Sequence, residues 1–181
     1  MEYLDIKACL DSMSILVDNR EQPSEKAEKR YKAFGCPYRR QTLLYGDYTY
    51  NFRINDKELF PADIPIGGDC IIERKMSLEE LSGNLSHERD RFNREFTKAM
   101  DAGASIYLLI ENGNLQKIYA GHYNTKFNNK AYFASFMAFL AKYHIQPLFC
   151  PAEMSGKVIY EVLYRELKAR LERGVYDEFC K

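Results

Sequence analysis

Short, continuous apolar runs alternate with longer amphipathic stretches along this chain, and no other feature of the sequence constrains the fold so strongly. Residues 15–17, 70–72 and 106–110 are apolar throughout, as expected of strands buried on both faces. Residues 25–34 follow a Pro-Ser pair and end at Gly35, which is the order of signals that opens and closes a helix. Strands that alternate with helices predict an α/β sandwich around a mixed sheet.

The remaining elements follow from the same kind of reasoning. Gly46-Asp47 separates two β-rich runs, and residues 55–68 carry two prolines and two glycines, which is typical of a loop inserted in a hairpin. Ser77-Leu78-Glu79-Glu80 has the pattern of a capping box and predicts a helix start. The further predicted strands are residues 42–45, 48–54, 69–74 and 145–149, and the further predicted helices are residues 86–102, 131–143 and 157–173.

Charge and composition exclude several classes of protein. The 181 residues include 26 basic and 26 acidic ones, so bulk charge does not indicate a polyanion partner. Five scattered cysteines and three distant histidines give little support to a zinc site. The N-terminus is no signal peptide, and the longest nearly apolar run is about half a membrane span. We therefore expect one soluble domain with reduced thiols, in the cytoplasm and without a membrane contact.

Charged residues at the end of one predicted strand suggest chemistry. Glu73 and Lys75 are two residues apart, so on a strand their side chains lie on the same face. A carboxylate beside an ammonium there suits a metal-assisted hydrolase, in which Glu73 binds a hard cation and Lys75 orients or polarises the attacking water. Any one of these charges alone is more simply explained as a solvated strand end.

Other strand ends supply further carboxylates in an ordered set. Asp47 comes into reach of Glu73 if the two strands pair as a hairpin, while Asp18 and Glu21 follow the first strand. Oxygen ligands without histidine or cysteine favour Mg²⁺ or Mn²⁺ over zinc. Because each group lies at the end of a predicted strand, we expect them to converge on one site.

These residues resemble the signature of a known family. Val17-Asp18-Asn19-Arg20-Glu21, Gly46-Asp47-Tyr48 and Ile72-Glu73-Arg74-Lys75 are similar to the V-D-x-R-E, G-D and E-R-K motifs of the XPF/Hef family of structure-selective DNA endonucleases. The resemblance runs in order over residues 14–111, and the later helices fit it through residue 173. We therefore expect an N-terminal extension at residues 1–13, a nuclease domain at 14–173, a tail at 174–181 and no helix-hairpin-helix domain.

The resemblance implies a restriction-endonuclease-like, three-layer α/β/α sandwich with a central mixed sheet. It also implies hydrolysis of DNA phosphodiester bonds near junctions of duplex and single strand, with Mg²⁺ or Mn²⁺ as cofactor. Asp47, Glu73 and Asp18 are the implied metal ligands, and Glu21 completes the acidic cluster. The family commonly forms dimers through its nuclease domains, so the expected partners are DNA and either a second copy of the chain or a targeting protein.

The catalytic residues implied by the resemblance are Asp18, Arg20, Glu21, Asp47, Glu73, Arg74 and Lys75. Lys75 matches the catalytic lysine, and Arg20 and Arg74 match arginines that contact phosphate or brace the acidic groups. The final aspartate of the family signature falls at Glu79, whose role is therefore open. Gly68-Asp69 lies on the same strand as Glu73, so it cannot face Glu73 across a hairpin as Gly46-Asp47 can.

DNA binding needs a local basic surface in a chain of zero net charge. Residues 20–40 hold seven basic and three acidic residues, among them Lys29 and Arg30. Arg94 lies in the predicted helix 86–102 and is a further candidate for phosphate contact. An ordinary solvated helix face, with pairs such as Glu25–Lys29, explains the first patch equally well.

The sequence as a whole favours a metal-dependent DNA endonuclease that acts on branched or flap DNA in repair or recombination. Its minimal architecture favours a phage or prophage origin. Two alternatives stay open at this point. One is a non-catalytic DNA-binding partner subunit, and the other is a resolvase-like or sequence-specific nuclease on the same fold.

Overall fold

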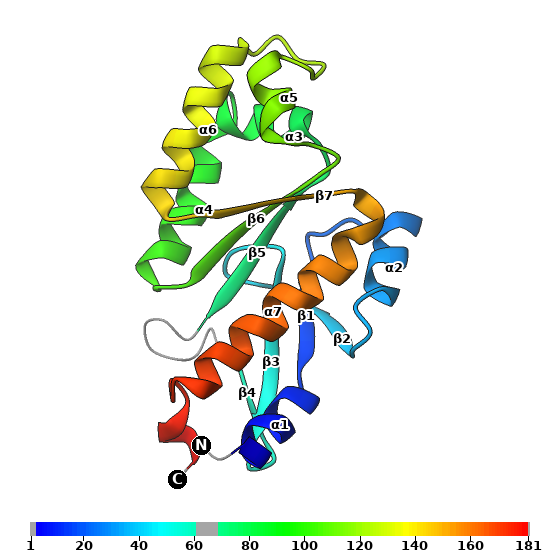
Figure 1. The fold of residues 1–181 in the computed structure, drawn as a ribbon, viewed down its shortest axis with the longest axis vertical. Helices are drawn as coiled ribbons and strands as arrows, with labels where there is room; N and C mark the ends of the chain where they lie inside the picture. Colours follow the sequence, from blue (N-terminus) through cyan, green and yellow to red (C-terminus); the bar gives the residue numbers. More distant parts are fainter. Residues whose placement is uncertain (1–2, 61–68, 181) are drawn as a thin grey trace.

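The computed structural model describes residues 3–60 and 69–180 as a mixed sheet covered by helices on both faces (Figure 1). The strands are β1 (Ser14–Asp18), β2 (Tyr38–Gln41), β3 (Tyr48–Ile54), β4 (Lys57–Leu59), β5 (Cys70–Lys75), β6 (Ser105–Glu111) and β7 (Gln146–Cys150). The helices are α1 (Tyr3–Asp11), α2 (Glu25–Lys32), α3 (Leu78–Leu85), α4 (Arg89–Asp101), α5 (Leu115–Ala120), α6 (Asn129–Tyr143) and α7 (Ser155–Glu172), with short 3₁₀ turns η2 (Ala152–Met154) and η3 (Asp177–Cys180).

The topology of the sheet gathers several strand ends at one edge. The order is β2-β1-β3-β5-β6-β7, with β4 paired to β3. β1 and β5 are both antiparallel to β3, whereas β6 and β7 are parallel to β5. The ends of β1, β5 and β6 therefore lie beside the start of β3. Backbone hydrogen bonds from Asp18 to Asp47 and from Asp47 to Ile72, each 2.9 Å, continue the pairing at this edge.

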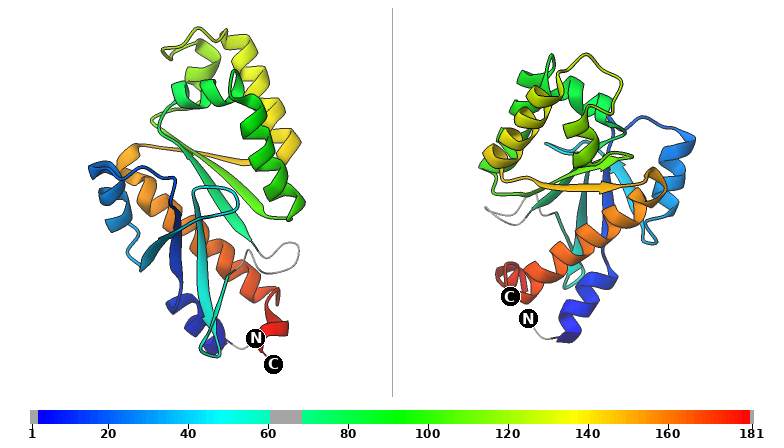
Figure 2. Two further views of the ribbon diagram at one scale, coloured as in Figure 1. Left: turned by 180° about the vertical axis from the view of Figure 1, so that it is seen from behind. Right: turned by 45° about the horizontal axis from the view of Figure 1, so that its top comes forward.

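Two hydrophobic cores make the chain a three-layer α/β/α sandwich, as predicted. One core lies between the sheet and α1, α2 and α7, and the other lies between the sheet and α3, α4, α5 and α6. Figure 1 shows α7, in orange to red, crossing one face of the sheet diagonally. Seen from behind in Figure 2, α7 lies beyond the sheet.

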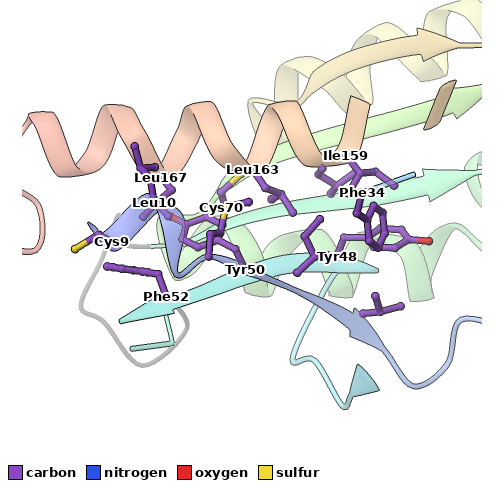
Figure 3. Packing of buried hydrophobic residues seen from close by; sticks show 14 of the residues in the cluster. Cys9, Leu10, Phe34, Tyr48, Tyr50, Phe52, Cys70, Ile159, Leu163 and Leu167 are labelled. Atoms are coloured by element: carbon purple, nitrogen blue, oxygen red, sulfur yellow. The ribbon is translucent and has the colours of Figure 1, made fainter. Parts of the chain in front are cut away.

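The first core joins α7 to the central strand β3. Ile159, Leu163 and Leu167 are four residues apart, so they share one face of α7, and all three are fully buried. Figure 3 shows them facing the aromatic rings of Tyr48 and Tyr50. This packing fixes β3, whose first residues follow the Gly46-Asp47 turn at the edge where the strand ends meet.

Gly156 lets the start of α7 approach α2 closely. A Cβ atom at this position would lie 2.4 Å from the carbonyl oxygen of Arg30 and 2.8 Å from the Cβ of Ala33. Only glycine fits without a shift of one helix. The close approach brings the N-terminus of α7 beside α2, near the same edge of the sheet.

The second core holds α4 over β5 and β6 through stacked aromatic rings. Phe92 and Phe139 are parallel with ring centres 4.8 Å apart, and Phe96 packs edge-on against both. Aromatic pairs of this geometry add about 0.5–1.5 kcal/mol beyond the area that they bury. They fix the position of Phe92, which lies against a charged residue of the site described below.

The structure corrects two of the predicted elements. Residues 42–45 form no strand, because the backbone N–H of Leu43 donates to the carboxylate of Asp18 instead of pairing with a neighbouring strand, and the strand of this region is β2, just before it. The helix predicted over residues 86–102 begins only at Arg89, since the chain leaves helical geometry at Ser86.

Other segments contain structure that the sequence pattern did not predict, among them α5. The expected loop at residues 55–68 begins as a tight turn, with positive φ at Asn55 and Asp56, which leads into β4. Residues 61–68 lie outside the described part of the chain. The segment expected to be an N-terminal extension forms α1, whose residues Cys9 and Leu10 are buried in the first core. None of the helices in the described part of the chain combines the length and the apolar character that a membrane-spanning segment needs.

Candidate active site

A cleft of about 450 Å³ opens at the edge where the strand ends meet. It lies between α2 and η2 on one side and α3 and α4 on the other, as its lining residues show. Six of the seven predicted catalytic residues line this cleft, namely Arg20, Glu21, Asp47, Glu73, Arg74 and Lys75. The structure therefore brings together groups that lie as far as 55 positions apart in the chain, from Arg20 to Lys75.

Asp47 faces the end of β5 because of the turn before it. Gly46 has φ +72°, and an added Cβ would lie 3.0 Å from the Cβ of Ile71, so this tight turn against β5 requires glycine. The backbone N–H of Arg74 then donates to Asp47 Oδ2 at 2.7 Å. This hydrogen bond fixes one carboxylate oxygen of Asp47 directly beside Glu73.

Lys75 lies beside Glu73 on the same face of β5, as their spacing predicted. Lys75 Nζ donates to Glu73 Oε1 at 2.7 Å, and both side chains are buried. The ammonium group also lies 4.9 Å from the centre of the Phe92 ring, within the range of a cation–π contact. The aromatic core beneath α4 therefore holds Lys75 in place at the cleft.

The electrostatics of these three groups favour a bound cation. Burial, together with the charge of Glu73, raises the pKa of Asp47 well above its ordinary value. Burial also raises the pKa of Glu73, although Lys75 opposes the shift. Burial would lower the pKa of Lys75, but Glu73 and Asp47 outweigh it and raise that pKa. A divalent cation between the two carboxylates would relieve their repulsion.

The donor set fits a hard divalent cation held with few protein ligands. Asp47 Oδ2 and Glu73 Oε1 each accept a hydrogen bond, and no described residue donates to the second oxygen of either carboxylate. In the described part of the chain, no three histidine, cysteine, aspartate or glutamate side chains converge as a metal cage. Mg²⁺ commonly binds through one or two carboxylates while water and substrate phosphate complete its shell.

Comparison with known proteins agrees with this geometry. Residues 17–162 match the family model of the ERCC4 domain, and this match includes all of the charged strand ends. This chain belongs to the ERCC4 domain family. The XPF-type resemblance expected from the sequence is therefore confirmed. No curated protein matches the chain.

Two solved structures of XPF from Aeropyrum pernix share the fold of this ERCC4 domain. The one in complex with DNA has a TM-score of 0.57 and 18% identity, and the match covers 84% of this chain and 63% of that one. The other has a TM-score of 0.59 and 16% identity, and the match covers 87% of this chain and 69% of that one. The restriction-endonuclease-like fold is thereby confirmed, while this chain spans somewhat less than two thirds of the XPF chain in the DNA complex.

Asp18 is not placed as a metal ligand in this ERCC4 domain. Its side chain is fully buried and does not line the cleft. Both oxygens are occupied, because Arg20 donates its backbone N–H and its side chain, and Leu43 donates its backbone N–H at 2.8 Å. Burial would raise the pKa of Asp18, but these hydrogen bonds outweigh it and lower the pKa. Asp18 therefore braces Arg20 and the loop after β2.

Glu21 likewise takes part in a buried network of charges. Two carboxylates, Glu21 and Glu111, alternate with two guanidinium groups, Arg30 and Arg74, and we call these residues the four-charge network. Glu21 lies 3.0 Å from Arg30 and 2.8 Å from Arg74, and Glu111 lies 3.3 Å from each. All four side chains are at most 10% exposed. Glu21 therefore pairs with arginines and does not join Asp47 as a metal ligand.

The structure places Glu80 at the cleft and Glu79 outside it. Glu79 accepts a hydrogen bond from the backbone N–H of Asn124 at 2.8 Å and does not line the cleft. Its neighbour Glu80 does line it, with one oxygen 3.7 Å from Lys75 Nζ and the other accepting from the backbone N–H of Met76. In the sequence analysis, Glu80 served only as part of the capping-box pattern that predicted the start of the helix, so its place in the cleft was missed.

The candidate DNA contacts are distributed differently from the prediction. Lys29 is exposed but pairs with Glu25 at 2.6 Å, and Arg30 is buried in the four-charge network. Arg94 is exposed and does not line the cleft, whereas Arg91, one turn earlier on α4, does. Arg20 lines the cleft with a side chain that is 56% exposed, so it is placed to meet a ligand.

Proposed function

We propose that this ERCC4 domain is a divalent-metal-dependent DNA endonuclease. The observation that carries the proposal is the arrangement of Asp47, Glu73 and Lys75, which converge on one cleft with two carboxylate oxygens left for a cation. Further support comes from one of the XPF structures with the same fold, which is a complex with DNA. Phosphodiester hydrolysis needs the groups that this cleft provides.

Asp47 and Glu73 would hold Mg²⁺ or Mn²⁺, since carboxylate oxygens suit both ions. A cation held there would lower the pKa of a bound water and would neutralise charge on the leaving oxygen. Lys75 holds Glu73 in place through its 2.7 Å hydrogen bond and leaves its other N–H bonds for the attacking water or a phosphate oxygen. The backbone N–H of Arg74 fixes the second ligand, Asp47.

Arg20 would bind the phosphate next to the one that is cut. Its guanidinium is held by Asp18 at 2.7 Å, and it also lies 3.4 Å from Glu95 of α4. An arginine that is oriented in advance on one side and exposed on the other loses little side-chain entropy when it binds a phosphate. Arg91, which lies on α4 and lines the same cleft, supplies a second positive charge.

We further propose that the substrate is branched or flap DNA, in repair or recombination, and that the chain acts as a homodimer or with a targeting partner. The XPF-type motifs support this part of the proposal. Light scattering on a dilute sample tests the dimer, and a monomer would contradict it. A non-catalytic DNA-binding subunit is the alternative that the experiment below must exclude.

Cleavage of labelled splayed-arm, 3′-flap, four-way-junction and plain duplex DNA tests the proposed activity. Reactions at low salt with Mn²⁺, Mg²⁺ or a chelator are compared for the wild type and Asp47→Asn. Metal-dependent cutting near the branch that disappears in the variant supports the proposal, whereas equal cutting of plain duplex would favour a resolvase-like or sequence-specific nuclease. Salt-sensitive binding without any cutting would instead identify a non-catalytic subunit.

A further inference from the structure

Two residues of the four-charge network, Arg30 and Glu111, are not among the catalytic residues that the XPF-type resemblance implies. Both line the cleft, and their side chains are only 6% and 4% exposed. Buried ion pairs are weak contributors to stability, because desolvation offsets much of their attraction. Their presence beneath a cleft therefore calls for an explanation other than stability.

The network connects directly to the end of β5 that carries the metal ligand Glu73 and the lysine. The guanidinium of Arg74 lies between Glu21 and Glu111, with contacts of 2.8 Å and 3.3 Å. Its backbone N–H donates to Asp47 at 2.7 Å. A change in how the side chain of Arg74 is held would therefore shift the hydrogen bond that orients Asp47.

Arg30 anchors the network to the two helices beside the cleft. It projects from α2, and its Nε donates to the hydroxyl of Ser155 at the start of α7 at 3.1 Å. Its Nη1 lies 3.0 Å from Glu21 and 3.3 Å from the hydroxyl of Tyr48. Because Glu21 also pairs with Arg74, these contacts link the position of the Arg74 side chain to the positions of α2, α7 and β3.

The network is also electrically balanced, with two carboxylates against two guanidinium groups. Removing one member leaves a whole unit charge in a poorly solvated place next to Asp47. The electrostatic energy between such a charge and a divalent cation is twice that with a monovalent cation at the same distance. Loss of Glu111 would leave excess positive charge and repel the cation, whereas loss of Arg30 would leave excess negative charge and attract it.

We propose that Glu111 and Arg30 are positioning residues of this site, whose opposite charges beside Arg74 set the charge at the base of the cleft and so tune the affinity of Asp47 and Glu73 for a divalent cation. This inference rests on the proposed function. A purely structural role would lower stability in every variant, but it would not shift metal affinity in opposite directions when the two partners are changed.

Calorimetric titration of the full chain with Mn²⁺ tests the inference without relying on cleavage. Glu111→Gln should weaken Mn²⁺ binding roughly tenfold, as the loss of an outer partner of a metal site typically does. Arg30→Gln should strengthen binding, and the neutral double variant should lie between the two single variants. Shifts in the same direction, or changes of less than about twofold in both single variants, would overturn the inference.

A control variant separates this electrostatic effect from loss of a buried ion pair in general. Glu166 pairs with the buried Arg170 on α7, and neither residue lines the cleft. Glu166→Gln should lower the melting temperature and leave Mn²⁺ affinity unchanged. An equal loss of Mn²⁺ affinity in this variant would also overturn the inference.

Two further results keep the test decisive. If Glu111→Gln does not fold, Arg30→Gln decides alone, and weaker or unchanged Mn²⁺ binding in that variant contradicts the inference. If the wild type cuts DNA with Mn²⁺ but the variants of the four-charge network bind the ion as it does, only the inference fails. If the wild type neither binds Mn²⁺ nor cuts DNA, the proposed function fails, and the inference fails with it.

Discussion

The backbone N–H of Arg74 donates to the carboxylate of Asp47 at 2.7 Å, so a residue of β5 orients the acidic residue that precedes β3. The side chain of the same arginine pairs with Glu21 on the other side of the strand. Arg74 thus joins two parts of the cleft, one that would bind the metal and one that is a buried network of charges.

Asp47 makes the metal-free protein less stable at neutral pH than a neutral side chain would. Its folded pKa is raised above its ordinary value of 3.8, so the folded state favours the protonated form. Relative to a fully ionised Asp47, protonation of this carboxyl stabilises the folded state. This stabilisation is complete below about pH 4, the ordinary pKa of the group, and is lost as the pH rises through the folded pKa. At pH 7, with chelator, Asp47→Asn should therefore raise the melting temperature by about 2–4 °C, the shift that ~1 kcal/mol gives in a domain of this size.

Scanning calorimetry between pH 5 and pH 8 checks this prediction of a pH-dependent difference. The difference in melting temperature between Asp47→Asn and the wild type should become smaller as the pH falls, because the wild-type carboxyl becomes protonated. With Mn²⁺ present, only the wild type should gain stability. A variant that melts below the wild type at pH 7 in chelator would show that the charge of Asp47 is already well compensated.

Lys75 should be needed for cleavage and not for DNA binding. Lys75→Met keeps much of the apolar volume against Phe92 but leaves Glu73 without its buried partner. We expect the single-turnover rate to fall by about 10²–10⁴, the usual contribution of one positioned catalytic group. Fluorescence anisotropy with labelled flap DNA in chelator should give a Kd within about threefold of the wild type. Cleavage at the wild-type rate would contradict the role given to Lys75.

Glu79 and Glu80 are neighbours that should behave differently. Glu80→Gln removes a carboxylate 3.7 Å from Lys75 and should lower the cleavage rate by about three- to tenfold. Glu79→Gln changes a side chain that binds the backbone of Asn124 outside the cleft, so it should leave the rate unchanged. Single-turnover cleavage rates of the two variants test this prediction. A lower rate in Glu79→Gln than in Glu80→Gln would show that Glu79, and not Glu80, contributes to cleavage.

Gly156 should tolerate no side chain, because α7 approaches α2 too closely there. Gly156→Ala places its new methyl group 2.4 Å from a backbone oxygen, which should destabilise the fold by about 1–3 kcal/mol. Gly83→Ala is the matched control, since that helical glycine meets only the imidazole ring of His87. Urea denaturation should show a lower midpoint for the first variant and no loss for the second. Equal midpoints for the two variants would mean that α7 can move away from α2 without loss of stability, which would contradict the prediction.

The sequence predicted the elements whose burial follows a simple period. β1, β5 and β6 appeared as apolar runs, and α2 and α3 were marked by the capping residues Ser24 and Ser77. β2 was missed because its sequence, Tyr-Arg-Arg-Gln, is polar and lies largely exposed at the edge of the sheet. An edge strand of this kind carries no apolar pattern for sequence analysis to detect.

The residues of the candidate site could be predicted where the geometry of a single strand determines the position of their side chains. Glu73 and Lys75 needed only the two-residue period of a strand. Asp18 was expected to bind metal, but the sequence does not show that Arg20 folds back onto it. Glu111 was missed although it follows an apolar run on its strand as Glu73 does, since no basic neighbour in the sequence drew attention to it.

The most direct test of the account is the single-turnover rate of flap-DNA cleavage as Mn²⁺ is titrated into chelated wild-type protein and into Asp47→Asn and Lys75→Met. We expect a cleavage rate that rises with Mn²⁺ and saturates in the wild type, and that is at least about a hundredfold lower in both variants. A rate independent of Mn²⁺, or one that both variants retain, would contradict a metal-dependent nuclease site at Asp47, Glu73 and Lys75.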